Sequence, residues 1–221
     1  MRNKGTGMIL LGLLLIAAAL FLTAYNLYDE QRAGQSAMQV IDQLEDLLPP
    51  KAPKETVTEP AGEQEAPAFF EQAPLPEYVL CPDMEMPVKT IGGMDYIGVL
   101  QIPSLELELP IASEWNYPNL KTAPCRYSGS AYLNNLILCG HNYASHFGSL
   151  KTLSEGDIAT FTDMAGNVFT YKLVEREILN PSDFAGMESG DWDLTLFTCT
   201  VGGQSRVTIR FEQDETVGNS A

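Results

Sequence analysis

The sequence predicts a mainly β protein: a closed or nearly closed barrel of about seven or eight strands with short helices, preceded by one N-terminal transmembrane helix. Two observations support this expectation. Short apolar runs separated by turn residues fill the chain after about residue 77, and one uninterrupted apolar run lies near the N-terminus. Helical stretches are few in the C-terminal part, with short candidates near residues 117–122 and 147–154.

The strands are predicted from apolar residues that alternate with a period of two, as in half-buried strands. Turn signals such as Asn134–Asn135 and Gly202–Gly203 separate them. The expected strands are 96–102, 105–111, 135–140, 157–162, 168–175, 194–199 and 206–211.

The N-terminal apolar run extends from Met8 to Ala24 without a charged residue. At about 1.5 Å per residue it just spans a thin hydrocarbon core. A cleaved signal peptide is the alternative, but Leu22 occupies a position before the cut where a small residue is preferred. Arg2 and Lys4 precede the run and acidic residues follow it. We therefore expect a single-pass protein of the cell membrane, with a cytoplasmic N-terminus and an extracellular remainder.

Residues 25–76 are expected to connect the anchor with the β-domain. Up to residue 48 the apolar spacing is roughly helical, which predicts a stalk helix or, alternatively, a self-association surface. Residues 49–76 are rich in Pro, Glu and Ala and predict an extended spacer that holds the domain away from the bilayer. The chain thus divides into an anchor at 1–24, a stalk and linker at 25–76 and a β-domain at 77–221.

Charge and cysteine content exclude several classes of partner. With 13 basic and 29 acidic residues, the net charge is −16, so we expect no nucleic-acid partner. Cys81, Cys125, Cys139 and Cys199 form no CxxC pair and have no zinc-like spacing. We expect no metal site and no cofactor. If one thiol serves chemistry, at most one disulfide can form among the other three.

The last two predicted strands place a thiol beside a guanidinium. A Gly–Gly pair between strands is typical of a tight hairpin, because primed turns need positive φ. Opposed residues have Cβ atoms about 5 Å apart and project from the same face. A one-residue shift of the turn would spoil this register. The expected pairs are Val201–Gln204, Thr200–Ser205, Cys199–Arg206 and Thr195–Arg210.

A histidine at a strand end is the next candidate. The apolar strand Leu136–Cys139 runs into Gly140 and His141, from where a side chain can project into a cleft. The other histidine, His146, lies in the following loop and is expected to be structural. The alternative for His141 is an ordinary surface or core residue, and for Arg206 a solvated strand arginine.

Together these motifs resemble the sortase family, cysteine transpeptidases of Gram-positive bacteria. Thr195-Leu196-Phe197-Thr198-Cys199 is similar to the signature Thr-Leu-any-Thr-Cys, and Gly140-His141-Asn142 to the family's histidine motif. Arg206 is similar to the arginine that opens the next strand. The resemblance covers roughly residues 90–213, leaves the subclass undetermined and implies a sortase catalytic domain within 77–221.

The resemblance implies cleavage of a sorting signal similar to Leu-Pro-any-Thr-Gly (LPXTG) in secreted proteins. Cys199 would attack the threonine carbonyl, His141 would act as acid and base, and Arg206 would stabilise the oxyanion. An amine of a cell-wall precursor or of another protein would then resolve the thioacyl-enzyme. Some relatives bind calcium through acidic residues before the histidine strand, but residues 116–135 contain no acid, so we expect no calcium dependence.

Further residues are candidates for substrate binding. The resemblance implies a role for Thr198 at the substrate end. Asn142 and Ser205 are candidates for supporting hydrogen bonds or, equally, for solvated loop positions. The connection 176–193 is expected to line the substrate groove. Its apolar residues, which form either the pocket for the substrate's leucine or ordinary core, are Ile178, Leu179 and Phe184.

Two other functions fit parts of the pattern. One is an extracellular Cys/His peptidase that only hydrolyses, although His141 precedes Cys199, the reverse of the papain-like order. The other is a non-enzymatic anchored β-domain, an adhesion or scaffold module in which Cys199 is merely buried.

Overall fold

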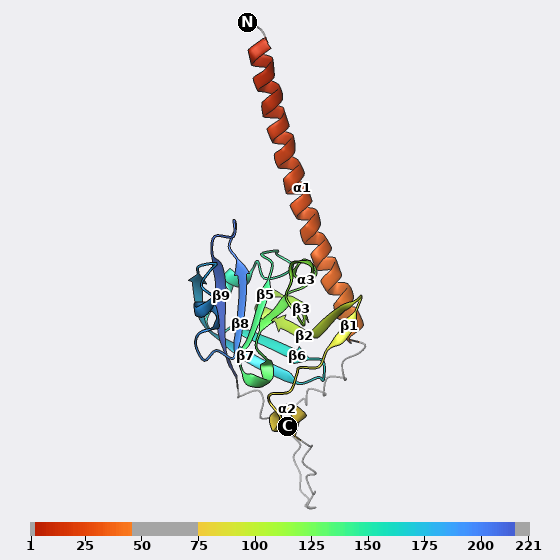
Figure 1. The fold of residues 1–221 in the computed structure, drawn as a ribbon, viewed down its shortest axis with the longest axis vertical. Helices are drawn as coiled ribbons and strands as arrows, with labels where there is room; N and C mark the ends of the chain where they lie inside the picture. Colours follow the sequence, from red (N-terminus) through yellow and green to blue (C-terminus); the bar gives the residue numbers. More distant parts are fainter. Residues whose placement is uncertain (1–2, 46–74, 215–221) are drawn as a thin grey trace, which may run out of the picture.

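Strands make up most of the C-terminal part of the chain, and one long helix precedes them (Figure 1). The structure is a computed structural model that describes residues 3–45 and 75–214. The elements in chain order are α1 (Asn3–Glu45), α2 (Glu77–Leu80), β1 (Lys89–Ile91), β2 (Met94–Ile102), η1 (Pro103–Leu105), β3 (Leu107–Ala112), α3 (Tyr117–Leu120), β4 (Cys125–Ser128), η2 (Ala131–Leu133), β5 (Leu136–Gly140), η3 (Leu150–Thr152), β6 (Ile158–Asp163), β7 (Val168–Leu179), α4 (Phe184–Glu188), β8 (Leu194–Cys199) and β9 (Arg206–Gln213).

The strands of residues 75–214 form a closed barrel. Their order is β1-β2-β3-β4-β5-β8-β9-β7-β6, and β6 pairs back with β2, so that eight strands close the ring and β1 extends it. Neighbours are antiparallel except for the parallel pairs β3–β4 and β5–β8. The predicted closed barrel of about seven or eight strands is confirmed. The short strands β1 and β4 were not expected from the sequence.

Gly98 allows the barrel to close between β2 and β6. A Cβ atom at this position would lie 2.3 Å from the carbonyl oxygen of Thr162 and 2.5 Å from the ring of Phe161. Only glycine permits so close an approach of the two strands. The register of β2 with β3 shifts between Tyr96 and Gly98, so a local irregularity accompanies the closure.

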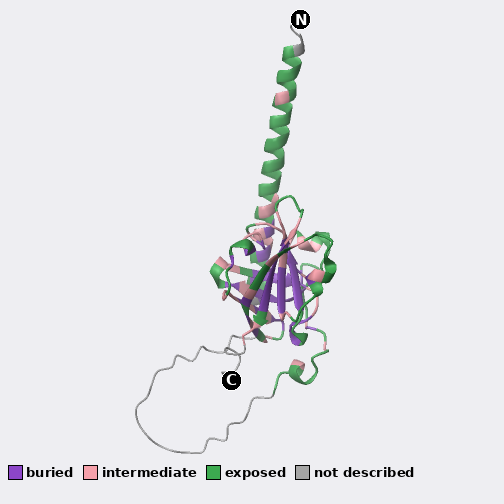
Figure 2. Ribbon diagram, turned by 90° about the vertical axis from the view of Figure 1, so that its left-hand side faces the viewer, coloured by how far each residue is buried: buried purple, intermediate pink, exposed green. Residues whose placement is uncertain are grey.

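The core lies inside the barrel, whose strands are largely buried (Figure 2). Leu136 and Leu138 of β5 and Leu194 and Leu196 of β8 are all fully buried there. Burial of one such side chain stabilises the fold by about 1.5–3 kcal/mol. The ends of these central strands are therefore fixed, which matters because the functional candidates lie at those ends.

α1 is one unbroken helix with two different surfaces. Its N-terminal part is exposed and apolar, whereas its C-terminal third packs against β3 and the outer wall of the barrel. The buried residues follow one helical face: Ala33, Ala37, Val40, Ile41 and Leu44. α1 is helical through most of residues 25–48, where a stalk helix is expected, and the apolar face of this part is covered by the barrel rather than free for self-association.

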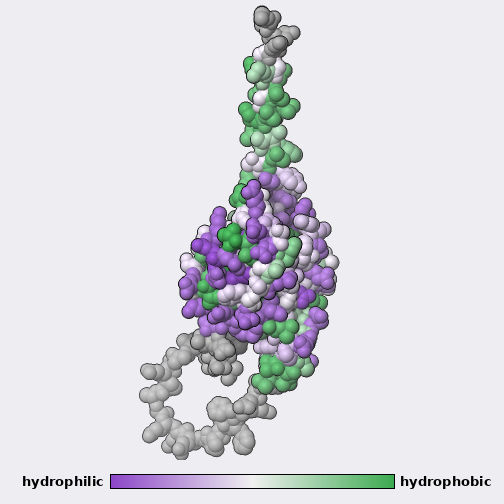
Figure 3. All heavy atoms as spheres, turned by 60° about the vertical axis from the view of Figure 1, so that its left-hand side comes forward, coloured by the Kyte–Doolittle hydropathy of each residue, from purple (hydrophilic) through white to green (hydrophobic). Residues whose placement is uncertain are grey.

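Within the described part of the chain, one helix is long and apolar enough to cross a membrane, Gly5–Leu44 within α1. Figure 3 shows the hydrophobic surface of this helix rising clear of the largely hydrophilic barrel. Most of the expected spacer lies in residues 46–74, outside the described residues. Because α1 contacts the barrel from Asp29 onward, the helix rather than the spacer sets the distance between the apolar run and the barrel.

Candidate active site

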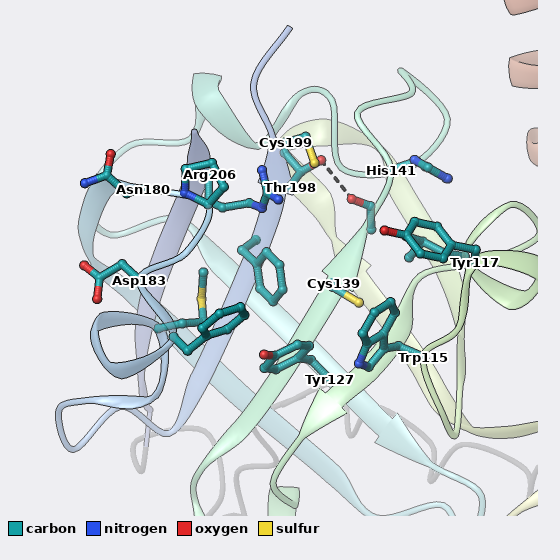
Figure 4. Close-up of a pocket in the computed structure, with 16 residues that line it drawn as sticks. Trp115, Tyr117, Tyr127, Cys139, His141, Asn180, Asp183, Thr198, Cys199 and Arg206 are labelled. Atoms are coloured by element: carbon teal, nitrogen blue, oxygen red, sulfur yellow. Dashed lines mark hydrogen bonds between the residues drawn. The ribbon is translucent and has the colours of Figure 1, made fainter. Parts of the chain in front are cut away.

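A cavity of about 400 Å³ opens where β5 and β8 end and β9 begins (Figure 4). Such a position suits a functional site, because rigid strand ends present side chains to an open space. Its lining residues include the three candidates of the predicted triad, Cys199, His141 and Arg206. Figure 4 shows Cys199 between the other two, with the guanidinium of Arg206 directed toward it.

The predicted register of β8 and β9 is confirmed. Cys199 lies opposite Arg206 and Thr195 lies opposite Arg210. The turn differs from the expected tight hairpin, because residues 201–204 form a loop and Val201 and Gln204 are not a ladder pair.

The β8–β9 loop keeps the register because its closing pair is intact. The amide of Thr200 donates to the carbonyl of Ser205 at 2.9 Å, and the amide of Gly203 donates to the carbonyl of Thr200 at 2.8 Å. Gly202 and Gly203 have φ values of 85° and 71°, which glycine adopts without steric cost. The two glycines thus belong to a longer loop than predicted, but Cys199 still lies opposite Arg206.

Arg206 is half-buried, and among the described residues its guanidinium is tethered by backbone carbonyls. Its Nη1 donates to the carbonyl oxygens of Gly203 and Ser205, each at 3.2 Å. No carboxylate among the described residues forms an ion pair with it. Its positive charge therefore remains available to a negative charge that develops beside Cys199.

His141 follows β5 directly, and its neighbour must be glycine. A Cβ atom on Gly140 would lie 2.6 Å from the ring of Phe147, which packs under the strand end. The amide of Phe147 donates to the carbonyl of His141 at 3.1 Å. The Gly-His motif thus has a packing reason: the loop folds back beneath the histidine and holds its backbone.

The imidazole of His141 is partly buried and stacks on Tyr143, with ring centroids 4.7 Å apart. Its Nε2 atom is buried and has no hydrogen-bond partner among the described residues. Burial lowers the pKa of His141 and Lys121 lowers it further, while the carboxylate of Asp29 raises it. The net effect favours the neutral imidazole, which can accept a proton.

The other predicted substrate residues divide into two groups. Thr198 and Phe184 line the cavity, and the hydroxyl of Thr198 donates to the carbonyl of Gly140 at 2.8 Å, which ties β8 to β5 beside His141. The cavity wall does not include the remaining four candidates, Asn142, Ser205, Ile178 and Leu179.

The expected groove segment 176–193 begins later than predicted. Ile178 and Leu179 belong to β7, where they pair with Val207 and Arg206 of β9. The β7–β9 ladder extends this far because both strands supply continuous backbone partners. Only the part after the strand, from Asn180 to Met187, reaches the cavity.

An aromatic wall of the cavity escaped the sequence analysis. Trp115 stacks on Tyr127 with centroids 6.1 Å apart, and Tyr127 makes an edge contact with Phe197 at 5.3 Å. Phe197 precedes Cys199 by two positions, so the period of β8 could have placed it on the cavity side. Trp115 lies in a loop, where no periodicity signals its orientation.

The other cysteines differ from Cys199 in their surroundings. Cys125 and Cys139 lie opposite each other on β4 and β5 and are buried as free thiols. Burial raises the pKa of both, that of Cys139 to about 12, so they remain protonated and unreactive. Cys199, by contrast, is only half-buried and reaches the cavity.

A closed β-barrel that gathers a thiol, an imidazole and a guanidinium around one cavity is the arrangement expected of a cysteine-dependent enzyme. The chain matches the sortase domain over residues 100–213, slightly more than half of its length. It therefore belongs to the sortase family. A comparison with curated proteins finds no match.

Solved sortase structures share this fold. Sortase A from Corynebacterium diphtheriae superimposes with a TM-score of 0.51 and 22% identity, over 55% of this chain and 61% of that chain. Streptococcus pneumoniae sortase C gives 0.50 and 21%, over 54% and 68%. A structure of Clostridium perfringens sortase C with the C-terminal cell wall sorting motif gives 0.49 and 23%, over 54% and 71%. The chain thus spans about three fifths of the C. diphtheriae protein, and the likeness is one of fold.

Proposed function

We propose that this chain is a membrane-anchored cysteine transpeptidase of the sortase type. Its substrates are secreted proteins with a C-terminal sorting signal similar to LPXTG. Its products are these proteins joined to an amine of the cell wall or of another protein. The observation that carries the proposal is the pairing of Cys199 with Arg206 at a cavity that His141 also lines.

The first half-reaction forms a thioester. Cys199 transfers its proton to His141, and its sulfur attacks the carbonyl carbon of the substrate threonine. The carbonyl oxygen becomes an oxyanion, which the guanidinium of Arg206 stabilises because it stays charged at any working pH. The peptide C–N bond then breaks, and the glycine amine leaves with the proton from His141.

The second half-reaction transfers the acyl group. An incoming amine gives a proton to neutral His141 and attacks the thioester carbon. The C–S bond then breaks, and the Cys199 thiolate takes that proton back from His141. The lowered pKa of His141 favours the neutral form that this step requires at neutral pH. Water in place of the amine would give hydrolysis.

The proposed location is the cell membrane, with α1 as a single-pass anchor. The basic residues Arg2 and Lys4 favour a cytoplasmic N-terminus. Cys81 offers a test, because it is exposed and lies on the barrel side of α1 in the chain. In a Cys199→Ala background, a membrane-impermeant thiol reagent should label Cys81 on intact cells. Labelling only after cell lysis would contradict this orientation.

The function is tested with the full chain in detergent micelles, a library of LPXTG-like peptides and an amine such as triglycine. We expect a peptide–amine adduct and a thioacyl-enzyme at Cys199, both detected by mass spectrometry. Cys199→Ala should abolish both, while Cys81→Ala should retain them.

Two outcomes would replace the proposal. Cleaved peptide without an adduct under any amine would identify a hydrolytic peptidase. If no acyl-enzyme forms, and Cys199 reacts with a methanethiosulfonate reagent only after denaturation, the chain is a non-enzymatic anchored β-domain.

A further inference from the structure

The loop that carries His141 is held by the anchor helix. Three consecutive loop residues, 143–145, contact α1 through groups more than a hundred positions away in the sequence. We call the α1 side of this contact the clasp and define it as Asp29, Glu30 and Gly34. Asp29 and Glu30 lie just before the apolar face that packs on the barrel, and Gly34 lies among the residues of that face.

The contacts of the clasp are specific hydrogen bonds and one close approach. The hydroxyl of Tyr143 donates to Oδ2 of Asp29 at 3.0 Å. The amide of Ala144 donates to Oε1 of Glu30 at 2.7 Å, and the hydroxyl of Ser145 donates to the carbonyl of Glu30 at 3.3 Å.

Gly34 allows the loop to lie this close to the helix. A Cβ atom there would be 3.1 Å from Cβ of Ser145, a distance at which the loop would have to shift. Hydrogen bonds to a carboxylate are also stronger than neutral ones. The clasp is therefore a shaped, charge-assisted contact and not a chance approach of two surfaces.

The clasp reaches His141 through Tyr143. The ring of Tyr143 stacks on the imidazole with centroids 4.7 Å apart and planes 30° apart, while its hydroxyl binds Asp29. The carbonyl of Tyr143 also accepts hydrogen bonds from the amides of His146 and Gly148. A displacement of Tyr143 would thus disturb both the stacked surface and the backbone that present His141.

We propose that Asp29, acting through Tyr143, is a positioning residue for His141, so that docking of the anchor helix sets the geometry of the catalytic histidine. This inference rests on the proposed function. Outer contacts that hold a catalytic group within a fraction of an ångström contribute strongly to rate, because misplacement by about 1 Å can lower turnover about 100-fold.

α1 also contributes to the electrostatic surroundings of His141. The charged or titratable groups around it are Asp29 and Glu30 on α1, Lys121 after α3, Tyr143 and His146 on its own loop, and Cys199 across the cavity. Asp29 is the group that raises the pKa of His141, against burial and Lys121. Loss of this carboxylate should lower that pKa further.

The test compares Asp29→Asn and Tyr143→Phe with matched controls in the full chain, held in micelles or nanodiscs. Asp42→Asn changes an exposed carboxylate of the same helix, and Tyr28→Phe removes an exposed hydroxyl from it. We expect each test variant to lower kcat about tenfold with KM within about twofold, and the controls to stay within about twofold of wild type. The double variant should be no worse than the worse single variant, because both act through one contact.

A second readout does not require turnover. The chain has only two histidines, and the imidazole signal that His141→Gln removes identifies His141 in an NMR titration. Asp29→Asn should move that signal and lower its midpoint pH, whereas Asp42→Asn should not.

The outcomes separate this inference from the proposed function. If wild type transfers the peptide but Asp29→Asn and Tyr143→Phe leave both kcat and the His141 signal unchanged, the positioning role is wrong. If wild type makes no adduct while Asp29→Asn still shifts the His141 signal, the function is wrong and the contact stands. Equal loss of activity and of thermal stability in Tyr143→Phe, with an unmoved His141 signal, would reduce the clasp to a structural contact.

Discussion

The rim of the cavity and the layer of the barrel beneath it use the same residue types in different ways. Arg206 and Arg210 lie on the same strand and the same face, four residues apart. Arg210 is 1% exposed and pairs with Glu177 at 2.7 Å. It also donates to Thr195, Met187 and Gly186, whereas the hydrogen bonds of Arg206 to the described residues go to two turn carbonyls.

The two histidines also differ, but in burial. His141 lines the cavity, while His146, five residues later, is fully buried. Burial, with a contribution from His141, lowers the pKa of His146 to about 4. The arginines teach that satisfied partners make a charged residue structural. The ring nitrogens of both histidines include buried atoms without a hydrogen-bond partner among the described residues, so here the difference is position: His146 is sealed in the fold, whereas His141 lies at the opening and is available for chemistry.

Arg210→Met should cause the largest loss of stability. The substitution leaves Glu177 without its ion-pair partner and the carbonyls of α4 without their hydrogen-bond donor. The free energy of unfolding should therefore fall by about 3–5 kcal/mol. Urea titration followed by tryptophan fluorescence measures this loss. Arg206→Met is the matched control and should change stability by less than about 0.5 kcal/mol. Similar losses for both variants would erase the distinction between the two arginines.

Arg206→Lys should affect activity and not stability. A point charge cannot reproduce the planar guanidinium beside Cys199, so kcat should fall by about 100-fold or more. Steady-state transfer of a sorting-signal peptide to triglycine measures it. If Arg210→Lys lowers kcat more than Arg206→Lys does, at a temperature where both variants are folded, then Arg206 is not the arginine that stabilises the oxyanion.

His146 should make the barrel sensitive to acid. The unfolded chain protonates this residue below its ordinary pKa of 6.5, but the folded chain only near pH 4. The unfolded state therefore binds more protons between these values. The contribution of His146, about 3 kcal/mol, should be present above pH 6.5 and lost as the pH falls to 4. In His146→Gln the decrease over this range should be smaller by about that amount, as equilibrium unfolding at several pH values can measure; an unchanged decrease would refute it.

Trp115→Ala should have the smallest effect of the four. It removes one aromatic surface from the cavity wall while Tyr127 and Phe197 remain, so KM should rise severalfold with kcat nearly unchanged, about 1 kcal/mol of binding. Val168→Ala, exposed and outside the cavity, is the control. A fall in kcat instead of a rise in KM would indicate that Trp115 contributes to the catalytic step and not only to substrate binding at the cavity wall.

The parts of the site that depend on local pattern could be predicted from sequence. The position of Cys199 opposite Arg206 follows from strand period and a glycine turn, and it survives the change from a tight hairpin to a longer loop because the Thr200–Ser205 pair is kept. The closed barrel follows from the number and length of alternating runs. Each of these inferences involves residues close together in the chain.

The parts that depend on distant contacts could not be predicted. Whether Ile178 belongs to a groove or to β7 is decided by its pairing with Val207 of β9, which no local pattern reveals. The apolar spacing of residues 25–48 predicts a helix with an apolar face, but it does not predict that this face packs on the barrel. The link from Asp29 to Tyr143 joins two ordinary surface residue types, and the sequence carries no signal for it.

The continuity of α1 has a consequence for how substrates arrive. With the apolar run of α1 in the membrane as proposed, Asp29 lies only five positions, or about 8 Å of helix, after Ala24. The helix then acts as a short, rigid connection, so the barrel can neither move away from the bilayer nor tilt freely relative to it. The cavity keeps a fixed height and orientation above the lipid surface. Under the proposed function, a substrate has to present its cleavage site within that shallow zone, so the reach of the substrate's own tether becomes part of the selection.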